Sequence, residues 1–300
     1  MKTNEVKRMH ESLNDRVVYF VICALLALFC FSTVYPFWHV LMYSLSNSKE
    51  AMSGGLFFKP RDFDPLAYRM IFKTNQIFIA YRNTILRTVI GTTLSMILSV
   101  MTAYPLSRRR LRGRGCLSMV FFFTMLFNGG MIPTYLIVQA YGLIDTFGAL
   151  IFPLAMNAYN MFILRNYFKT VPESLEESAF IDGANSFTIL WKIIIPVSTP
   201  ALAAVTMFYG VANWNNYLDG VLYINSTRLE ILQVYLRKLL ASTGTLNALS
   251  GIDGLSQAAS LSEESMKMAT IAVSILPVLV VYPFIQRYYT SGITAGAVKE

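Results

Sequence analysis

Long apolar stretches dominate this sequence, and they restrict the classes of protein to which it can belong. Hydrophobic residues make up 55% of the 300, charged residues only 14%, and the mean hydropathy is +0.49. A soluble domain this apolar would expose surface that it could not cover with polar groups. About 20 apolar residues in succession are long enough to cross a bilayer as a helix. The chain is therefore predicted to be an all-α integral membrane protein.

Six apolar stretches are predicted to span the membrane as helices, because only helices satisfy their own backbone hydrogen bonds at these lengths in lipid. The first is longer than the apolar core of a signal peptide and lacks a small-residue cleavage site, so it is expected to remain uncleaved. Pro36 is expected to kink or end its outer part. The predicted spans are 17–45, 78–106, 116–140, 147–168, 197–223 and 266–289.

Basic residues indicate which loops face the cytoplasm. Five arginines lie within residues 107–115, here called the arginine loop, whereas the loop over 141–146 has no Lys or Arg and contains Asp145. Short loops rich in Lys and Arg stay on the cytoplasmic side. Both termini of a multi-pass protein in the cell membrane are therefore predicted to be cytoplasmic. The net charge of +8 is attributed to this orientation in lipid, and no nucleic-acid partner is expected.

The predicted topology divides the chain into a short cytoplasmic segment, 1–16, and a membrane domain, 17–300. Three parts of the membrane domain lie outside the spans. The loop 172–196 and the tail 290–300 are placed in the cytoplasm, and the outer loop 224–265 is placed outside. At roughly forty residues the outer loop is too long for a simple connection.

Residues that carry chemistry are scarce in this chain. His10 and His39 are isolated, and the cysteines Cys23, Cys30 and Cys116 have no disulfide or metal-ligand spacing. No catalytic residue, metal site or bound cofactor is predicted. Ion-driven carriers usually place ionisable side chains deep in the membrane. The predicted spans have almost none between the two interfaces, so the energy for moving a solute is expected from another source. A phosphate-binding Gly-x4-Gly-Lys-Ser/Thr loop is also absent from the sequence.

Neutral polar residues and glycines within the spans are candidates for a translocation path. Asn128, Gly129 and Gly130 would let the third helix unwind, so that freed backbone groups line a cavity; a packing kink explains them equally well. Polar side chains in spans four and five can hydrogen-bond a hydroxyl-rich solute or pack helices together. The candidates are Asn128, Gly129, Gly130, Asn157, Asn213, Trp214 and Asn216.

Two arginines in the outer part of the second span, Arg82 and Arg87, have two interpretations. They could attract an acidic solute, or their long side chains could extend to lipid headgroups. The second interpretation is favoured.

The loop over 172–196 is predicted to form a helix, a sharp turn and a second helix. Pro172 and the carboxylates that follow it are typical of a helix start, where negative charge faces the positive end of the helix dipole. Gly183 can adopt the left-handed conformation that ends a helix. Ser186 is expected to cap the second helix and Pro196 to end it. This shape suits docking into a partner's groove; an amphipathic helix lying on lipid headgroups is the alternative.

The same loop carries a resemblance to a known family. Glu177-Ser178-Ala179, three residues, Gly183, nine residues and Ile193-x-Ile195-Pro196 resembles the Glu-Ala-Ala…Gly…Ile-x-Leu-Pro signature of binding-protein-dependent ABC importer permeases. Ser178 replaces alanine and Ile195 replaces leucine. The resemblance implies the type I ABC importer permease fold of six transmembrane helices, with this loop as a coupling helix in a cleft of an ATPase subunit. The implied ATPase-coupling residues are Glu176, Glu177, Ser178, Ala179, Asp182, Gly183 and Ala184.

Resemblance extends over most of the chain. Segments 127–135, 217–223 and 292–299, together with Leu232-Gln233, are similar to one branch of carbohydrate permeases, the second permease of maltose-type importers. That branch includes importers of uronate-rich oligo- and polysaccharides such as alginate. Two positions depart from it, Ile231, where proline is frequent, and the final Glu300, where glycine is usual.

The resemblance also implies partners. They are a second, homologous permease, two ATPase subunits that bind ATP and Mg, and an external solute-binding protein that is expected to contact the outer loop. In the related permeases the C-terminal tail of one subunit reaches between the ATPases, which makes Gly296 and Lys299 candidate contacts; a frayed chain end is the alternative.

Two functions of different class are therefore weighed. The favoured one is the permease subunit of an ATP-driven saccharide importer, which is not itself an enzyme. The other is a membrane-embedded enzyme or scaffold subunit without ATPase partners. An enzyme would need paired carboxylates, a histidine-rich metal set or a Ser/His/Asp group, and this sequence has only two histidines.

Overall fold

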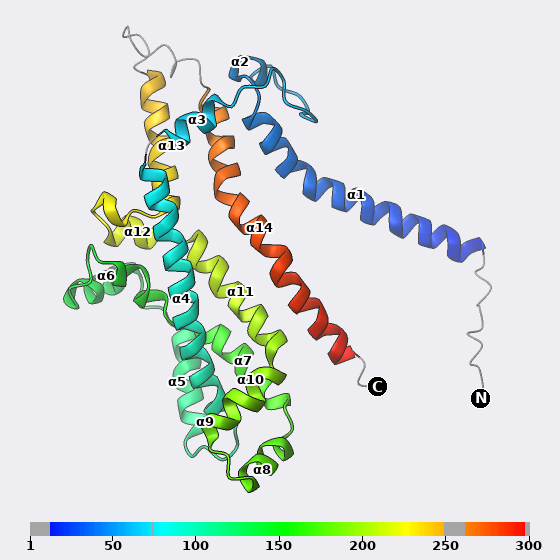
Figure 1. Ribbon diagram of the computed structural model, residues 1–300, viewed down its shortest axis with the longest axis vertical. Coiled ribbons are helices and arrows are strands. Elements are labelled where there is room, and N and C mark those ends of the chain that lie inside the picture. The colour runs from blue at the N-terminus through cyan, green and yellow to red at the C-terminus, as the bar shows by residue number, and fades with distance from the viewer. Residues whose placement is uncertain (1–12, 74, 249–261, 298–300) are drawn as a thin grey trace. The chain divides into compact units, whose positions relative to one another are not determined.

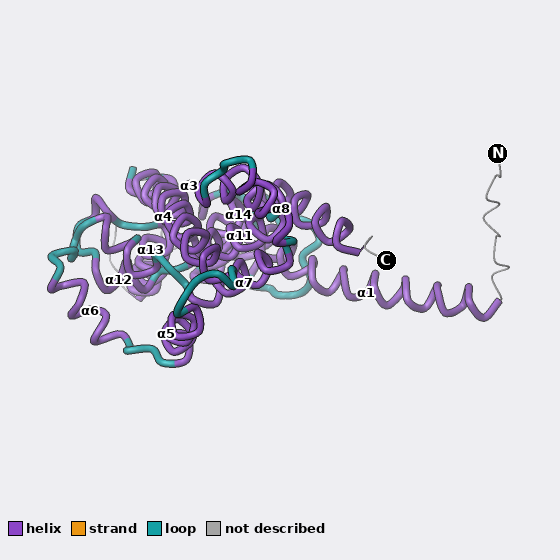
Figure 2. Tube along the Cα trace, turned by 90° about the horizontal axis from the view of Figure 1, so that it is seen from below, coloured by secondary structure: helices purple, strands orange, loops and turns teal. Residues whose placement is uncertain are grey.

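The computed structural model describes residues 13–73, 75–248 and 262–297, and this part of the chain is helical. Figure 2 shows helices joined by loops, and the only pairing of extended backbone among the described residues is one isolated bridge between Ser46 and Phe63. The all-α prediction is confirmed. The described residues belong to two compact units, Met1–Arg69 with Thr243–Ala272, and Met70–Ser242 with Val273–Glu300.

Figure 1 shows the order of the helices along the chain. The α-helices are α1 (Leu13–Ser44), α2 (Ser48–Ala51), α3 (Leu66–Phe72), α4 (Gln76–Ser107), α5 (Arg114–Leu126), α6 (Met131–Ala140), α7 (Ala158–Thr170), α8 (Glu173–Ile181), α9 (Ser186–Ile189), α10 (Ile195–Val197), α11 (Thr199–Asn215), α12 (Leu218–Tyr223), α13 (Leu232–Ala248) and α14 (Glu263–Ala297). Short helices with other hydrogen-bond patterns lie between them. The 3₁₀ helices are η1 (Phe147–Leu150), η2 (Phe152–Leu154) and η4 (Thr227–Leu229), and η3 (Leu190–Ile194) is a π-helix.

Three helices, α4, α7 and α11, pack side by side and form the centre of the second unit (Figure 1). The side of α4 that faces them carries small residues, which allow helices to approach closely in a membrane. One polar contact joins all three helices. The Tyr209 hydroxyl on α11 lies 2.7 Å from the Ser99 hydroxyl on α4 and accepts from the Asn157 backbone N–H at the start of α7. The buried small residues of α4 include Ala80, Thr84, Gly91, Ser95, Ser99 and Ala103.

The third and fourth predicted spans are bent, and of these two the sequence indicated a break only for the third. The helices α5 and α6 meet at 114°, and the turns of η1 and η2 meet α7 at 51°. The helical run over Ser186–Val197 meets α11 at 86°. By length and composition, two helices in the described part of the chain can each cross a membrane, and up to five spans result if each bent pair counts as one. The sixth predicted span coincides with α14.

Several predicted boundaries differ from those in the structure. Pro36 lies inside α1 and does not end it, which leaves a kink as its predicted effect. The helical run that contains Pro196 ends at Val197, one residue beyond the predicted end. The predicted fifth span stops at Asn215 and resumes as α12. The last span continues as helix to Ala297, so most of the predicted tail is helical.

The first unit contains α1, α2 and the start of α14. Tyr43, Ala51 and Phe57 form a small buried cluster, and the Ser48 hydroxyl donates to the Ser265 hydroxyl at 3.2 Å. By contrast, the most apolar 18-residue window of α1 has no buried residue. An apolar helix with its side chains exposed in this way is suited to contact with lipid or with another membrane subunit.

Candidate functional site

The helix α8 begins and ends as its sequence predicts. Pro172 is its N-cap, and Glu173 and Glu176 lie in the first turn. At the other end Gly183 has φ +83°. The Ala184 N–H donates to the Ala179 carbonyl at 2.9 Å, and the Gly183 N–H donates to the Phe180 carbonyl at 3.0 Å. This hydrogen-bond pair closes the helix end and turns the chain sharply.

The second helical run starts one residue earlier than predicted. Asn185, not Ser186, is the cap, because its side-chain oxygen accepts from the Thr188 N–H at 2.8 Å. Ser186 is the first residue of α9. Asn and Ser are both good cap residues, so the sequence did not distinguish them.

The seven predicted coupling residues divide into two sets. The residues of the first set face outward and can be reached by a partner. Ile181, which lies beside them but is not one of the seven, is 87% exposed. Those that face inward hold α8 to the rest of the chain, and Glu176 is only 6% exposed. The exposed set is Glu177, Ser178, Asp182 and Gly183; Glu176 and Ala179 are buried, and Ala184 is partly buried.

Glu176 is buried against the arginine loop. Its Oε1 lies 2.5 Å from Nη2 of Arg108. The Arg110 guanidinium lies over the ring of Phe180, one turn further along α8, at 4.4 Å. Burial raises the pKa of Glu176 above its ordinary value, while the charges of Arg108 and Arg110 act in the opposite direction. The arginine loop, which was predicted from its charge to be cytoplasmic, therefore also contacts α8.

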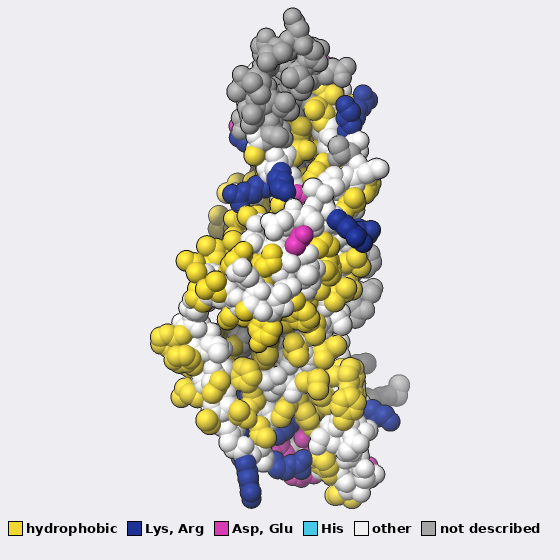
Figure 3. All heavy atoms as spheres, turned by 90° about the vertical axis from the view of Figure 1, so that its left-hand side faces the viewer, with side chains coloured by type: hydrophobic (Ala, Val, Ile, Leu, Met, Phe, Trp, Pro, Cys, Tyr) yellow, Lys and Arg dark blue, Asp and Glu magenta, His cyan; other side chains and the backbone are white. Residues whose placement is uncertain are grey.

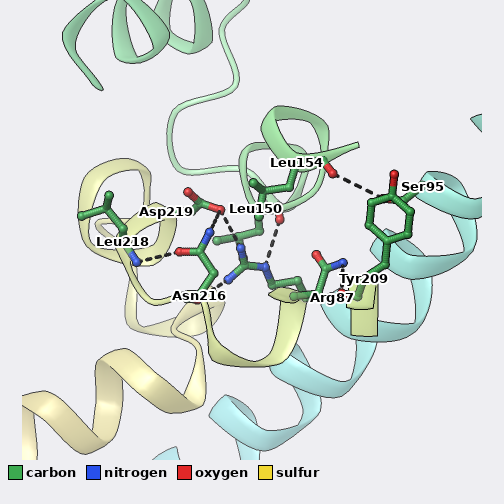
Figure 4. A network of polar contacts seen from close by, with 9 residues as sticks. Arg87, Ser95, Leu150, Leu154, Tyr209, Asn216, Leu218 and Asp219 are labelled. Atoms are coloured by element: carbon green, nitrogen blue, oxygen red, sulfur yellow. Dashed lines mark hydrogen bonds and ion pairs between the residues drawn. The ribbon is translucent and has the colours of Figure 1, made fainter. Parts of the chain in front are cut away.

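A buried arginine lies near the other end of α4 (Figure 4). Arg87 is completely buried, and its Nη2 lies 2.6 Å from Oδ2 of Asp219. Its Nε donates to the Leu150 carbonyl at 3.0 Å and its Nη1 to the Asn216 carbonyl at 2.7 Å. The Asn216 side chain donates to the same carboxylate oxygen of Asp219. The favoured interpretation of Arg87, a side chain that reaches lipid headgroups, was wrong. The guanidinium is buried and is paired with the Asp219 carboxylate inside the protein. Arg82 is exposed.

The predicted translocation residues lie in separate local contacts. Asn128 accepts from the Gly130 N–H at 2.8 Å and, like Gly129 and Gly130, is exposed at the bend between α5 and α6. Asn157 caps α7 by accepting from the Asn160 N–H. Asn213 is buried and donates to the Tyr209 carbonyl. The described contacts therefore give packing and capping roles to the two asparagines on α7 and α11.

Among the predicted path residues, Trp214 lines a cavity in the second unit. The cavity has a volume of about 650 Å³ and lies between α4, α11 and the Val273–Ala297 part of α14. Its walls are mostly apolar, with hydroxyl groups from Thr88, Thr92 and Thr206. The Trp214 indole N–H donates to the Ser274 carbonyl, which ties α11 to α14. The threonines were missed because a threonine in an apolar stretch carries no signal that separates a cavity wall from a packed surface.

Two loops are tied together by one carboxylate. Asp145, which has φ +58°, accepts from the Asn225 and Ser226 N–H groups at 3.0 and 2.9 Å. These backbone bonds hold the pKa of Asp145 below its ordinary value. The start of the outer loop is also bound to α4, because Asn83 donates to the Arg228 and Glu230 carbonyls.

The remaining predicted residues are placed only in part. Gly296 lies in α14, and Lys299 lies outside the described residues. Within the described ranges, no group of three His, Cys, Asp or Glu residues could hold a metal ion. Figure 3 shows hydrophobic side chains over the middle of this face, with charged side chains both toward the end where Figure 1 places α8 and in the upper part of the view.

Comparisons with known proteins extend over nearly the whole chain. Residues 8–295 match the family described as binding-protein-dependent transport system inner membrane component. The polygalacturonan/rhamnogalacturonan transport system permease protein YtcP of Bacillus subtilis (strain 168) is 43% identical, over 96% of this chain and 100% of that protein. Protein LplC of the same organism is 37% identical, over 98% of this chain and 99% of that protein.

Solved structures share the fold. A chain in the crystal structure of a bacterial ABC transporter involved in the import of the acidic polysaccharide alginate aligns with a TM-score of 0.80 and 36% identity, over 93% of this chain and 98% of that one. A chain of a bacterial alginate ABC transporter in complex with alginate pentasaccharide-bound periplasmic protein aligns with a TM-score of 0.54 and 14% identity, over 91% and 93%. The second likeness concerns the fold alone.

Proposed function

The chain belongs to the family of binding-protein-dependent transport system inner membrane components and is a permease subunit of an ABC importer, and from this we propose that it moves uronate-rich oligo- or polysaccharide into the cytoplasm by alternating access. The subunit transports and does not catalyse a reaction. ATP and Mg bind to partner ATPase subunits, and no cofactor binds to this chain. Both termini lie in the cytoplasm.

The observation that carries the coupling role is the division of α8 into an exposed and a buried side. Glu177 and Ser178 face outward on a helix whose end is closed by Gly183, so a partner meets a surface of defined shape. Acidic Glu177 and apolar Ile181 together suit a groove with a basic residue and an apolar floor. An ATPase subunit that closes on ATP would displace this surface.

Motion of α8 would reach the helices that surround the membrane path. The chain enters α8 directly from α7 through Val171 and Pro172, and it leaves through the run Ser186–Val197 into α11. Both α7 and α11 pack on α4. Displacement of one short helix would therefore change the relative positions of three packed helices, which is how a local event produces a discrete change of state.

The acidic solute is proposed from the relatives. One is named for polygalacturonan and rhamnogalacturonan, and a solved structure similar to this chain belongs to an alginate importer; all are acidic polysaccharides. In this chain Arg87 is neutralised by Asp219, so it does not supply a free charge to the solute. The exposed Arg82 remains a candidate for attracting an acidic sugar near the outer face.

The partners proposed are a second permease, two ATPase subunits and an external solute-binding protein. Contact with the binding protein is assigned to the outer loop 224–265, whose start is held to α4 and Asp145. Gly296 and Lys299 are proposed to lie near the ATPases at the C-terminal end.

Purification and reconstitution test the function. The chain should co-purify with a second permease and ATPase subunits, and mass spectrometry would identify them. In proteoliposomes the complex and its binding protein should accumulate labelled trigalacturonate only with ATP and Mg. Turnover of a lipid or saccharide by the isolated chain, or import without ATP, would contradict the proposal.

A further inference from the structure

We propose that Arg108 is a positioning residue for coupling, which holds α8 against the inner end of α4 through Glu176 so that the two helices move together. This inference rests on the proposed function, because it assumes that α8 receives the motion of an ATPase subunit. It assigns to the arginine loop a mechanical role in addition to membrane orientation.

Arg108 is placed for this role by its position in the chain. It directly follows Ser107, the last residue of α4, and its backbone N–H still donates to the Pro105 carbonyl. Its guanidinium therefore lies at the end of a 32-residue helix, about 48 Å long, that extends through the unit. A force on this side chain acts on α4 with no flexible linker between them.

The contact with α8 is largely shielded from solvent at both ends. Arg108 and Glu176 have side chains that are 11% and 8% exposed, and their charged atoms are 2.5 Å apart. Screening by water and salt is weak at such a site, so the attraction is stronger than for a surface pair. Removing one partner leaves a buried charge without compensation, which is strongly unfavourable.

A second contact restricts rotation of α8. Phe180 follows Glu176 by four residues and so lies on the same side of the helix. Arg110 covers its ring at 4.4 Å. Two side chains of the arginine loop thus contact α8 one turn apart, and two points define its direction where one would allow it to pivot.

The neighbouring residues Glu177 and Arg109 make neither the ion pair nor the ring contact between the arginine loop and α8. Glu177 is exposed beside the buried Glu176, and Arg109 is exposed beside Arg108. Membrane orientation depends on the number of basic residues in a short loop and not on which of them is buried. Orientation therefore does not explain why Arg108 is shielded from solvent while Arg109 is exposed, whereas the contact with α8 does.

The experiment uses the whole complex, purified with its ATPase and permease partners and its binding protein. The variants are Arg108→Gln, Glu176→Gln and the two combined, with Arg109→Gln as the matched control that removes the same charge from the same loop. Hydrogen exchange of the α8 amides is measured without solute. Import of labelled trigalacturonate per ATP hydrolysed is measured in proteoliposomes.

We expect faster exchange of the α8 amides in both single variants than in Arg109→Gln. Import per ATP should fall roughly tenfold, within the usual range of coupling between sites, while ATP hydrolysis persists. The combined variant should be no worse than the more affected single one, because the two residues act as one pair. Arg108→Lys, which keeps the charge, should restore part of the coupling.

Exchange and coupling equal to those of Arg109→Gln would overturn the inference, as would independent, additive losses in the combined variant. If Arg108→Gln prevents assembly, Glu176→Gln decides the question, because it changes one atom and keeps the volume; normal exchange in that variant overturns the inference. Absence of ATP-dependent import by the unmodified complex would instead contradict the proposed function, and the exchange comparison would still decide the role of Arg108.

Discussion

Nη2 of Arg87 lies 2.6 Å from Oδ2 of Asp219, a residue 132 positions later in the sequence. The pair joins the outer part of α4 to α12, and two further bonds from the same guanidinium reach the Leu150 and Asn216 carbonyls. One buried side chain of α4 thus contacts three later segments of the chain (Figure 4).

Arg87→Met is expected to destabilise the permease by about 3–5 kcal/mol, because it leaves the Asp219 carboxylate buried without its cation. The thermal unfolding midpoint of the purified complex measures the loss. Arg82→Met, at an exposed position five residues earlier, is the control and should leave the midpoint nearly unchanged. Replacing both partners, as in Arg87→Met with Asp219→Leu, should cost less than Arg87→Met alone. Equal midpoints for Arg87→Met and Arg82→Met would contradict the structural role.

Gly183→Pro is expected to uncouple import from ATP hydrolysis. The residue has φ +83°, and proline fixes φ near −65° and removes the N–H that donates to Phe180. A Cβ on residue 183 would have no neighbouring atom within 4 Å, so Gly183→Ala tests the backbone conformation without a steric clash and should cost only about 1–2 kcal/mol locally. Import and hydrolysis in reconstituted vesicles give the answer. Normal import by Gly183→Pro would show that the turn after α8 is not needed for coupling.

Glu177→Lys is expected to weaken docking of the ATPase without affecting the fold. The side chain is exposed, and surface substitutions of this kind usually change stability by less than about 0.5 kcal/mol. Reversal of its charge would repel a basic residue in the partner's groove. The measurement is the amount of ATPase subunit that co-purifies with the variant, and Glu173→Lys, at the start of the same helix, is the control. Retention of both the ATPase and full import would remove Glu177 from the interface.

The sequence predicted helix positions well where one local signal determined them. The helix α8 begins after Pro172 and ends before Gly183, as expected. The resemblance carried by residues 177–196 is confirmed by the family match. Partners far apart in the chain were not predictable. No spacing rule relates Arg87 in the second predicted span to Asp219 in the fifth. Glu176 and Glu177 are the same residue type, and only the packing of α8 shows which one is buried.

Deletion of 243–254 from the outer loop is expected to abolish stimulation of ATP hydrolysis by the binding protein and to leave basal hydrolysis intact. The deletion removes the last turn and a half of α13 and residues 249–254, which lie outside the described part. It spares residues 224–232, which are bound to Asp145 and α4. Hydrolysis with and without binding protein is compared in the same preparation. Unchanged stimulation would exclude this part of the loop from the contact.

Truncation at Ile293 is expected to lower ATP hydrolysis and import together. The helix α14 continues eight residues beyond Tyr289, the predicted end of the last span, and these add about 12 Å of helix on the side assigned to the cytoplasm. A regular helix that reaches beyond the membrane can meet an ATPase subunit more reproducibly than a frayed end, because less conformational entropy is lost on contact.

The truncated chain keeps every predicted span, so assembly with the second permease should persist and serves as the control. Lys299→Gln distinguishes an effect of the Lys299 charge from an effect of the length of α14. It removes the charge of Lys299, which lies outside the described part, and keeps the helix to Ala297. If the contact depends on the helix, truncation should reduce hydrolysis severalfold and Lys299→Gln only slightly. Near-normal hydrolysis in the truncated, fully assembled complex would show that residues beyond Gly292 take no part in coupling.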